Sequence, residues 1–271
     1  MKDSREEWFD AGKKVAVTIV DVTSAAQELA RGHLAGPTST HFLTEALASV
    51  ALLGGEMSEA GETVILQMKC KGPLGGFNVE CTSEGTLRGY AEKKVLDDFD
   101  GLGRPDARKV IGEAQYQVTR SVPGRILSQG ISTSIDGYLT GSLQRKACIR
   151  TEIVVSDEVE VLEARGVMVE ILPDSKLGSL GSEGLKDPLL PLLDSKDPLS
   201  LSVASRNVLK QLGLENAELR KTTPLKFACR CSPDRAIAML AALSDEERRS
   251  LPPSIDITCH MCGKTFTVKT K

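Results

Sequence analysis

The chain reads Phe227-Ala228-Cys229-Arg230-Cys231-Ser232 and then Ile257-Thr258-Cys259-His260-Met261-Cys262-Gly263-Lys264 close to its C-terminus. These stretches supply two cysteine pairs separated by 27 residues. Two pairs at this spacing can converge on one zinc ion as a tetrahedral tetrathiolate, which closes the coordination shell and leaves no position for a catalytic water. We therefore predict a structural or regulatory zinc site, one zinc per chain, with Cys229, Cys231, Cys259 and Cys262 as its ligands.

The spacing within the first pair is informative. Cys-x-x-Cys followed by Gly-Lys, as in residues 259–264, is typical of a zinc knuckle, whereas Cys229-x-Cys231 is unusual for a purely static ribbon. Thiolates that share one metal are also close enough to pair with each other when an oxidant attacks, and each oxidation removes ligands. Spacing alone therefore leaves two hypotheses open, a redox switch and a zinc site with no redox role.

Upstream of the cysteines, residues 174–224 form a Leu-rich segment without any aromatic residue. Gly and Pro interrupt its first half, so any helix there must be short and dependent on tertiary contacts. We expect a metastable segment that folds against a neighbour but not alone. Its leucines are residues 177, 180, 185, 189, 190, 192, 193, 199, 201, 209, 212, 214 and 219.

Residues 1–173 combine helical and strand periodicities. Ser24 to Gln27 has the pattern of a capping box before a short helix. Apolar residues from Phe42 to Leu53 recur at helical spacing after Pro37 and stop at Gly54, which predicts a core helix. Alternating or β-rich stretches predict strands, the first three joined by glycine turns as a β-meander, at residues 64–70, 77–81, 87–90, 116–122, 147–155 and 167–172.

The sequence thus predicts an α+β protein in three parts. These are a mixed α/β core domain with β-meander sheets over residues 1–173, a metastable helical segment over 174–224 and a small zinc-binding domain over 225–271. A length of 271 residues suits one substantial domain plus a smaller module.

Overall composition restricts the cellular setting and the partners. The net charge of −3 does not indicate a protein built to coat nucleic acid or an anionic membrane. The N-terminus carries charges where a signal peptide needs an apolar stretch, and no segment reaches the length of a membrane helix, so we predict a cytoplasmic protein. In a reducing compartment, clustered thiols are expected to be metal ligands or redox centres rather than structural disulfides.

The remaining cysteines and histidines have simpler interpretations. Cys70, Cys81 and Cys148 lie in strand patterns and are predicted to be small core residues. His260 lies between two ligands and is expected to point outward. His33 and His41 have no catalytic motif nearby and are interpreted as surface or capping residues.

With these residues taken together, the chain resembles the heat shock protein 33 chaperones. The resemblance rests on the two cysteine stretches with Asp234-Arg235 between them. It also rests on core sequences that look like the family's helix end and meander, namely Ala51-Leu52-Leu53-Gly54, Leu66-Gln67-Met68, Gly72-Pro73-Leu74-Gly75-Gly76, Val79-Glu80 and Arg88-Gly89-Tyr90. It covers nearly the whole chain. One departure is Ser142-Leu143-Gln144, where the family usually has Ser-Glu-Gln.

The resemblance implies an ATP-independent holdase chaperone, not an enzyme, that is inactive while reduced and zinc-bound. On oxidation the family forms two disulfides, which map here to Cys229 with Cys231 and Cys259 with Cys262, and releases zinc. The Leu-rich segment matches the family's linker, which unfolds on activation. The implied partners are unfolding client proteins and, when oxidised, a second copy of the chain in a homodimer; no nucleic acid or membrane is implied.

Two other function classes compete with this hypothesis. A nucleic-acid-binding zinc ribbon would use the mild basic excess of residues 225–271, eight Lys/Arg against five Asp/Glu, although Phe227 and Phe266 are the only aromatic residues there for base stacking. A thiol-disulfide exchange enzyme would use Cys259-x-x-Cys262, but such enzymes place the motif at a helix N-terminus after a strand.

Overall fold

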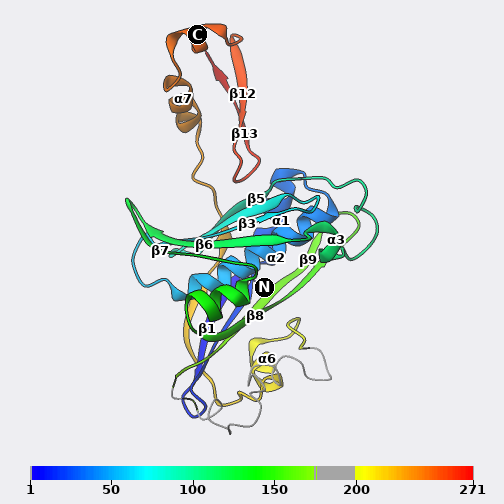
Figure 1. Ribbon diagram of the computed structural model, residues 1–271, viewed down its shortest axis with the longest axis vertical. Coiled ribbons are helices and arrows are strands. Elements are labelled where there is room, and N and C mark those ends of the chain that lie inside the picture. Colours follow the sequence, from blue (N-terminus) through cyan, green and yellow to red (C-terminus); the bar gives the residue numbers. More distant parts are fainter. Residues whose placement is uncertain (1, 174, 176–198, 271) are drawn as a thin grey trace.

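The computed structural model describes residues 2–173, 175 and 199–270 (Figure 1). The expected Gly- and Pro-interrupted half of the Leu-rich segment falls almost entirely on residues 176–198, outside the described residues. The strands are β1 (Ser4–Asp10), β2 (Val15–Asp21), β3 (Thr63–Cys70), β4 (Gly76–Thr82), β5 (Thr86–Ala91), β6 (Ala114–Val122), β7 (Arg125–Ser132), β8 (Lys146–Val155), β9 (Val161–Ile171), β10 (Glu218–Pro224), β11 (Lys226–Phe227), β12 (Ser254–Thr258) and β13 (Thr265–Lys269). The helices and helical turns are α1 (Thr23–His33), α2 (Pro37–Leu53), η1 (Gly54–Glu56), α3 (Ala107–Val110), α4 (Ile135–Gly137), η2 (Tyr138–Ser142), α6 (Ser205–Gln211), α7 (Pro233–Ala241) and α8 (Asp245–Ser250).

Two large sheets enclose the helices α1 and α2 (Figure 1). The five-stranded sheet has the order β10-β1-β2-β9-β8, and the six-stranded sheet has the order β11-β5-β4-β3-β6-β7. Neighbouring strands are antiparallel, except that β11 runs parallel to β5. The run β5-β4-β3 within the six-stranded sheet confirms the predicted β-meander, and the two sheets with their helices confirm the α+β fold.

Helix α2 forms the centre of the core. It begins with Pro37 at its first position, where a missing N–H costs nothing, and ends before Gly54-Gly55, as the sequence predicts. It packs against β8 and β9 of one sheet and against β4 and β5 of the other. Fourteen of its 17 residues are buried, because a helix between two sheets has apolar neighbours on nearly every side.

The predicted capping box at Ser24 is wrong, although the short helix that it announced is present. Helix α1 begins at Thr23, two residues before the start that a Ser24 cap implies, and its first amides are bound by the carboxylates of Asp21 and Asp3. Asp3 accepts hydrogen bonds from the amides of Ser24 and Ala25 at 3.0 and 2.6 Å, which leaves the Ser24 hydroxyl without a capping role. Gln27 instead accepts a hydrogen bond from the amide of Val161 at 2.6 Å.

The six predicted strands are present as β3 to β6, β8 and β9, whereas β1, β2, β7 and β10 to β13 were not predicted. Strand β10 pairs with β1 from Glu218 to Pro224 and thus joins the core sheet, although we assigned its residues to the Leu-rich segment. The proposed division into three domains remains a prediction. The described residues 199–217, with the seven-residue helix α6, cover the outer face of the five-stranded sheet as part of one apolar cluster.

The C-terminal module consists of α7, α8 and the hairpin β12-β13 and extends from one end of the core (Figure 1). Ser232 caps α7 by accepting a hydrogen bond from the amide of Arg235, and Pro233 takes the first helical position. The turn of the hairpin points back toward β5 (Figure 1).

Candidate metal centre

The two cysteine pairs come from two kinds of local structure. Cys229 and Cys231 lie between β11 and α7, two residues apart, so an extended backbone places both side chains on one side of the chain. Cys259 and Cys262 lie in the turn between β12 and β13. The amides of Cys262 and Gly263 both donate to the carbonyl of Cys259, which curls this turn around its two thiols.

The structure brings all four predicted ligand residues together. Their Sγ atoms lie within 4.8 Å of one another, with Cys229 and Cys259 at 3.8 Å and Cys231 and Cys262 at 3.4 Å. A tetrahedral zinc site with sulfur–zinc bonds of about 2.3 Å places its sulfurs about 3.8 Å apart. The four thiols therefore fit a metal ion of this kind.

Protonation also favours a cation at the centre of the cluster. Burial alone would raise the pKa of the Cys229 thiol, but hydrogen bonds from the Cys231 amide and the Arg88 guanidinium lower that pKa to about 7. The pKa values of Cys231 and Cys262 are raised, chiefly by burial. One thiolate thus forms near neutral pH, whereas a positive charge at the centre is needed to hold Cys231 and Cys262 deprotonated as well.

The thiol cluster is docked directly on the core. Strand β11 pairs with β5, and the amide of Ala228 donates to the carbonyl of Leu87 at 3.0 Å. From the other half of the site, the carbonyl of Met261 accepts a hydrogen bond from the amide of Gly89 at 3.1 Å. Both cysteine pairs are therefore anchored to the same strand, β5.

Two glycines allow this close approach. Gly263 has φ of 72°, and a Cβ atom there would lie 1.9 Å from the carbonyl oxygen of Gly32 at the end of α1. A Cβ atom at Gly32 would lie 2.6 Å from the carbonyl oxygen of Cys262. Backbone meets backbone at this point, so side chains at either position would push the hairpin turn away from the core.

A buried carboxylate joins the cluster to the six-stranded sheet. Glu80 on β4 is 5% exposed and accepts a hydrogen bond from Arg88 of β5 at 2.7 Å. Arg230, between the first two cysteines, forms a second ion pair with Glu80. Arg88 also lies 3.9 Å from the sulfur of Cys229. Sequence analysis assigned no site role to these three residues. Glu80 and Arg88 lie opposite one another on β4 and β5, at equal distances from the predicted turn at Ser83 to Gly85, so their pairing could have been predicted from the sequence.

The cysteines and histidines outside the predicted ligand set lie partly where the sequence predicted. Cys81 and Cys148 are buried, as expected, and Cys70 is half-buried; burial raises the pKa of Cys81 to about 11. His260 is exposed, and its ring packs edge-to-face on Tyr90. The prediction of a surface or capping role is wrong for His33, which is 3% exposed and hydrogen-bonds the carbonyl of Gly89 at 2.8 Å. That partner is 56 residues away, which is why local pattern missed it.

Comparison with known proteins gives the same assignment. The family model described as Hsp33 protein matches residues 6–269. The chain belongs to the Hsp33 family. A 33 kDa chaperonin of Thermus thermophilus is 29% identical, over 94% of this chain and 81% of its own length. A 33 kDa chaperonin of Symbiobacterium thermophilum is 27% identical, over 98% of this chain and 94% of its own length.

The fold is shared as well. The crystal structure of the 33 kDa chaperonin, an Hsp33 homolog, from Thermotoga maritima has a TM-score of 0.84 over 100% of this chain and 96% of that chain, at 19% sequence identity. Membership of the Hsp33 family supports a chaperone function. Within residues 2–173, 175 and 199–270, none of the helices has the length and hydropathy that crossing a bilayer requires.

The competing interpretation as a thiol-disulfide exchange enzyme predicted a helix N-terminus at Cys259, and the structure has a hairpin turn there. Cys259 follows strand β12 but enters a hairpin turn, and within the described C-terminal residues no helix begins at the motif. Because those enzymes lower their thiol pKa with a helix N-terminus, this site lacks their means of activation.

Proposed function

We propose that this Hsp33 family member is an ATP-independent holdase chaperone whose client binding is switched on by oxidation of Cys229, Cys231, Cys259 and Cys262. The observation that carries the proposal is the thiol cluster itself. Its four sulfurs lie within 4.8 Å of one another, and both halves are docked on strand β5 of the core. A rearrangement of the four cysteines would therefore disturb backbone contacts with the core directly.

In the resting state, the four thiolates would hold one zinc ion. Soft thiolate ligands in a tetrahedral arrangement favour zinc, and four protein ligands leave no open position for a substrate or water. When bound, the ion supplies only cross-links between the two cysteine pairs. The proposal accordingly assigns no enzymatic reaction to the site.

In the activating step, thiolates are oxidised to disulfides. For each disulfide, two thiolates lose two electrons as an S–S bond forms, and a peroxide accepts these electrons and two protons as its O–O bond breaks to give two waters. We propose the pairs Cys229 with Cys231 and Cys259 with Cys262, by resemblance to the family. The sulfurs also lie close together crosswise, Cys229 with Cys259 at 3.8 Å and Cys231 with Cys262 at 3.4 Å, so disulfide mapping is needed to test this assignment.

Loss of the cross-links would propagate to the Leu-rich segment. Strand β10 pairs with β1 of one sheet, and β11, which follows after a single residue, pairs with β5 of the other sheet. We call this continuous segment, residues 218–227, the strap. Once the module no longer holds that strap, residues 199–217 keep only their own contacts with the core. Their leucines then become available to the apolar segments of unfolding clients.

The proposal places the protein in the cytoplasm, where a reducing environment keeps the four thiolates reduced until oxidative stress. It also includes a homodimer of the oxidised chain, by resemblance to the family. Neither nucleic acid nor membrane has a role in it.

The experiment uses the full chain. Reduced protein should contain one zinc per chain and should not suppress the aggregation of a heat-labile client. Peroxide with mild heat should release the zinc and turn on suppression without ATP, and reductant should restore the four thiols. Equal suppression by fully reduced, zinc-loaded protein would contradict the proposal.

A further inference from the structure

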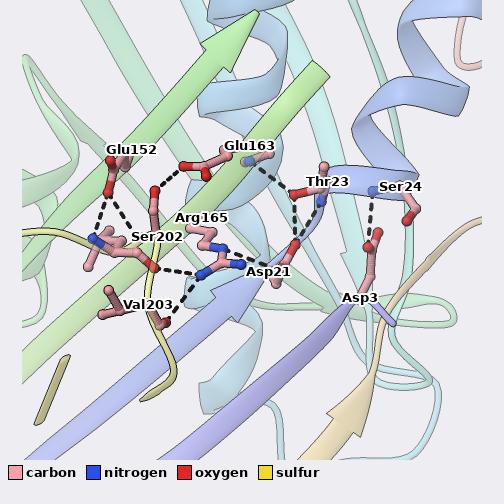
Figure 2. A network of polar contacts seen from close by, with 11 residues as sticks. Asp3, Asp21, Thr23, Ser24, Glu152, Glu163, Arg165, Ser202 and Val203 are labelled. Atoms are coloured by element: carbon pink, nitrogen blue, oxygen red, sulfur yellow. Dashed lines mark hydrogen bonds and ion pairs between the residues drawn. The ribbon is translucent and has the colours of Figure 1, made fainter. Parts of the chain in front are cut away.

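A polar contact site on the core holds residues 201–203 of the Leu-rich segment (Figure 2). Glu152 on β8 accepts hydrogen bonds from the amides of Leu201 and Ser202, at 2.6 and 3.2 Å. Arg165 on β9 donates to the carbonyl oxygens of Leu201 and Val203, at 2.8 and 3.2 Å. Four backbone groups of three consecutive residues are thus bound by one carboxylate and one guanidinium.

The sheet places this pair of side chains together. Glu152 and Arg165 are directly opposite one another in the antiparallel register of β8 and β9, so their side chains lie on the same face of the sheet. Asp21 forms an ion pair with Arg165 at 3.3 Å and is itself fixed by the amide and hydroxyl of Thr23. Figure 2 shows this chain of contacts from Thr23 through Asp21 to Arg165 and the bound segment.

The contacts surround a buried leucine. Leu201 is 3% exposed and belongs to the apolar cluster on the outer face of the five-stranded sheet. Glu152 and Arg165 bind its amide and its carbonyl, so the backbone is fixed on both sides of the inserted side chain. The Ser202 hydroxyl, which donates to Glu163, adds a side-chain contact from the segment.

We propose that Glu152 and Arg165 form a binding site for extended polypeptide backbone, occupied in this structure by residues 201–203, that holds the Leu-rich segment on the core while the protein is reduced. Because the atoms bound by Glu152 and Arg165 are backbone atoms, these four hydrogen bonds do not depend on which side chains the segment carries. Arg165 also keeps its ion pair with Asp21 when the segment leaves, so release does not strand the guanidinium charge. The site lies on β8 and β9, whereas the thiol cluster docks on β5 of the other sheet, so it acts without touching the metal ligands.

One part of this inference rests on the proposed function, namely that release of the segment favours client binding. The binding site itself is tested in the reduced, zinc-loaded full chain by hydrogen exchange. Glu152→Ala removes the acceptor of two amides, so exchange in a peptide covering residues 199–204 should accelerate about tenfold, the change that follows from losing about 1.4 kcal/mol of protection. Exchange in β3 and β4 should not change, and the zinc content should stay at one per chain.

The matched control is Glu158→Ala, which removes an exposed carboxylate in the turn of the same β8-β9 hairpin. It should leave exchange at residues 199–204 at the wild-type rate. Glu152→Gln is a second test that preserves side-chain volume and one amide oxygen as an acceptor, so it should fold normally and show a smaller acceleration.

Unchanged exchange at residues 199–204 in both Glu152 variants would overturn the binding site. Accelerated exchange in Glu152→Ala, with the control unchanged, would support it whatever the chaperone assay shows. If that variant released the segment but neither suppressed client aggregation in the reduced state nor needed less oxidant, the proposed function would fail at its step from segment release to client binding, while the binding site would stand.

Discussion

The interior between the two large sheets and the interior of the C-terminal module differ in how much apolar surface they bury. Between the sheets, long side chains such as Leu47, Leu52, Leu66 and Met68 are fully enclosed. In the described part of the module, the buried apolar cluster contains only Ala236, Leu240 and Val268, with half-buried neighbours around them. At about 25 cal/mol per Å² of buried apolar surface, such a cluster contributes little against the entropy of ordering about 45 residues. We therefore infer that the module, unlike the core, depends on the proposed metal cross-link of its four thiols.

The largest expected effect tests this difference directly. Cys262→Ser removes one of the four proposed ligands, and metal binding in sites of this kind contributes about 10–16 kcal/mol to folding. The module should lose its zinc and its fold, whereas exchange protection in β3, β4 and α2 should persist. Cys81→Ser, a buried cysteine of the core sheet, should keep the zinc.

The converse substitution sharpens the comparison. Leu66→Ala creates a cavity in the fully enclosed interior and should lower the free energy of core unfolding by about 2–5 kcal/mol, measured by denaturant titration. The zinc content of the reduced protein should not change. Loss of zinc in this variant, under conditions where the core is still folded, would show that the two regions are not separable.

A smaller effect is expected at the junction between the two regions. Glu80→Ala leaves Arg88 and Arg230 without their shared carboxylate and should weaken docking by about 3 kcal/mol. Exchange of the amides of Ala228 and Gly89, which bond across the junction, should rise more than tenfold while the zinc stays bound. Glu84→Ala, at an exposed position of the adjoining β4-β5 turn, is the matched control and should have no such effect.

The smallest effect concerns pH. Burial, with a contribution from Arg104, lowers the pKa of His41 to about 4. The unfolded chain therefore binds a proton near pH 6.5 that the folded core binds only near pH 4, so the stability of the core should fall as the pH drops through this window. His41→Gln cannot titrate and should remove at most about 2 kcal/mol of that decline, since the ring is partly solvated. Parallel stability–pH profiles of wild type and variant would contradict this assignment.

Local pattern predicted those elements whose partners are near in sequence. The helix Pro37–Leu53 and the meander from β3 to β5 are defined by their own periodicity and by glycine turns. Strand β10 could not be found in this way, because its partner β1 lies more than 200 residues away and its own residues are almost all exposed. Strand β2 does carry a local signal, because all residues from Val15 to Val20 except Ala16 are β-branched.

The candidate site shows the same division. Spacing identified the four cysteines, because a metal site requires particular residue types at short intervals. Spacing gave no indication of the contacts that join the site to the core. The backbone approach of Gly32 to Gly263 and the ion pair of Arg230 with Glu80 both link residues at least 150 positions apart. Contacts of this kind depend on the assembled fold rather than on a local sequence.

The central claim is that oxidation of the thiol cluster releases the Leu-rich segment while the core stays folded. The most direct measurement is one oxidation time course of the full chain, in which zinc release, disulfide content and hydrogen exchange are followed together. The account predicts that zinc is lost first, that exchange then rises across residues 199–217 and the C-terminal module, and that β3, β4 and α2 remain protected. Zinc-free, disulfide-bonded protein in which residues 199–217 keep the protection of the reduced state would contradict it.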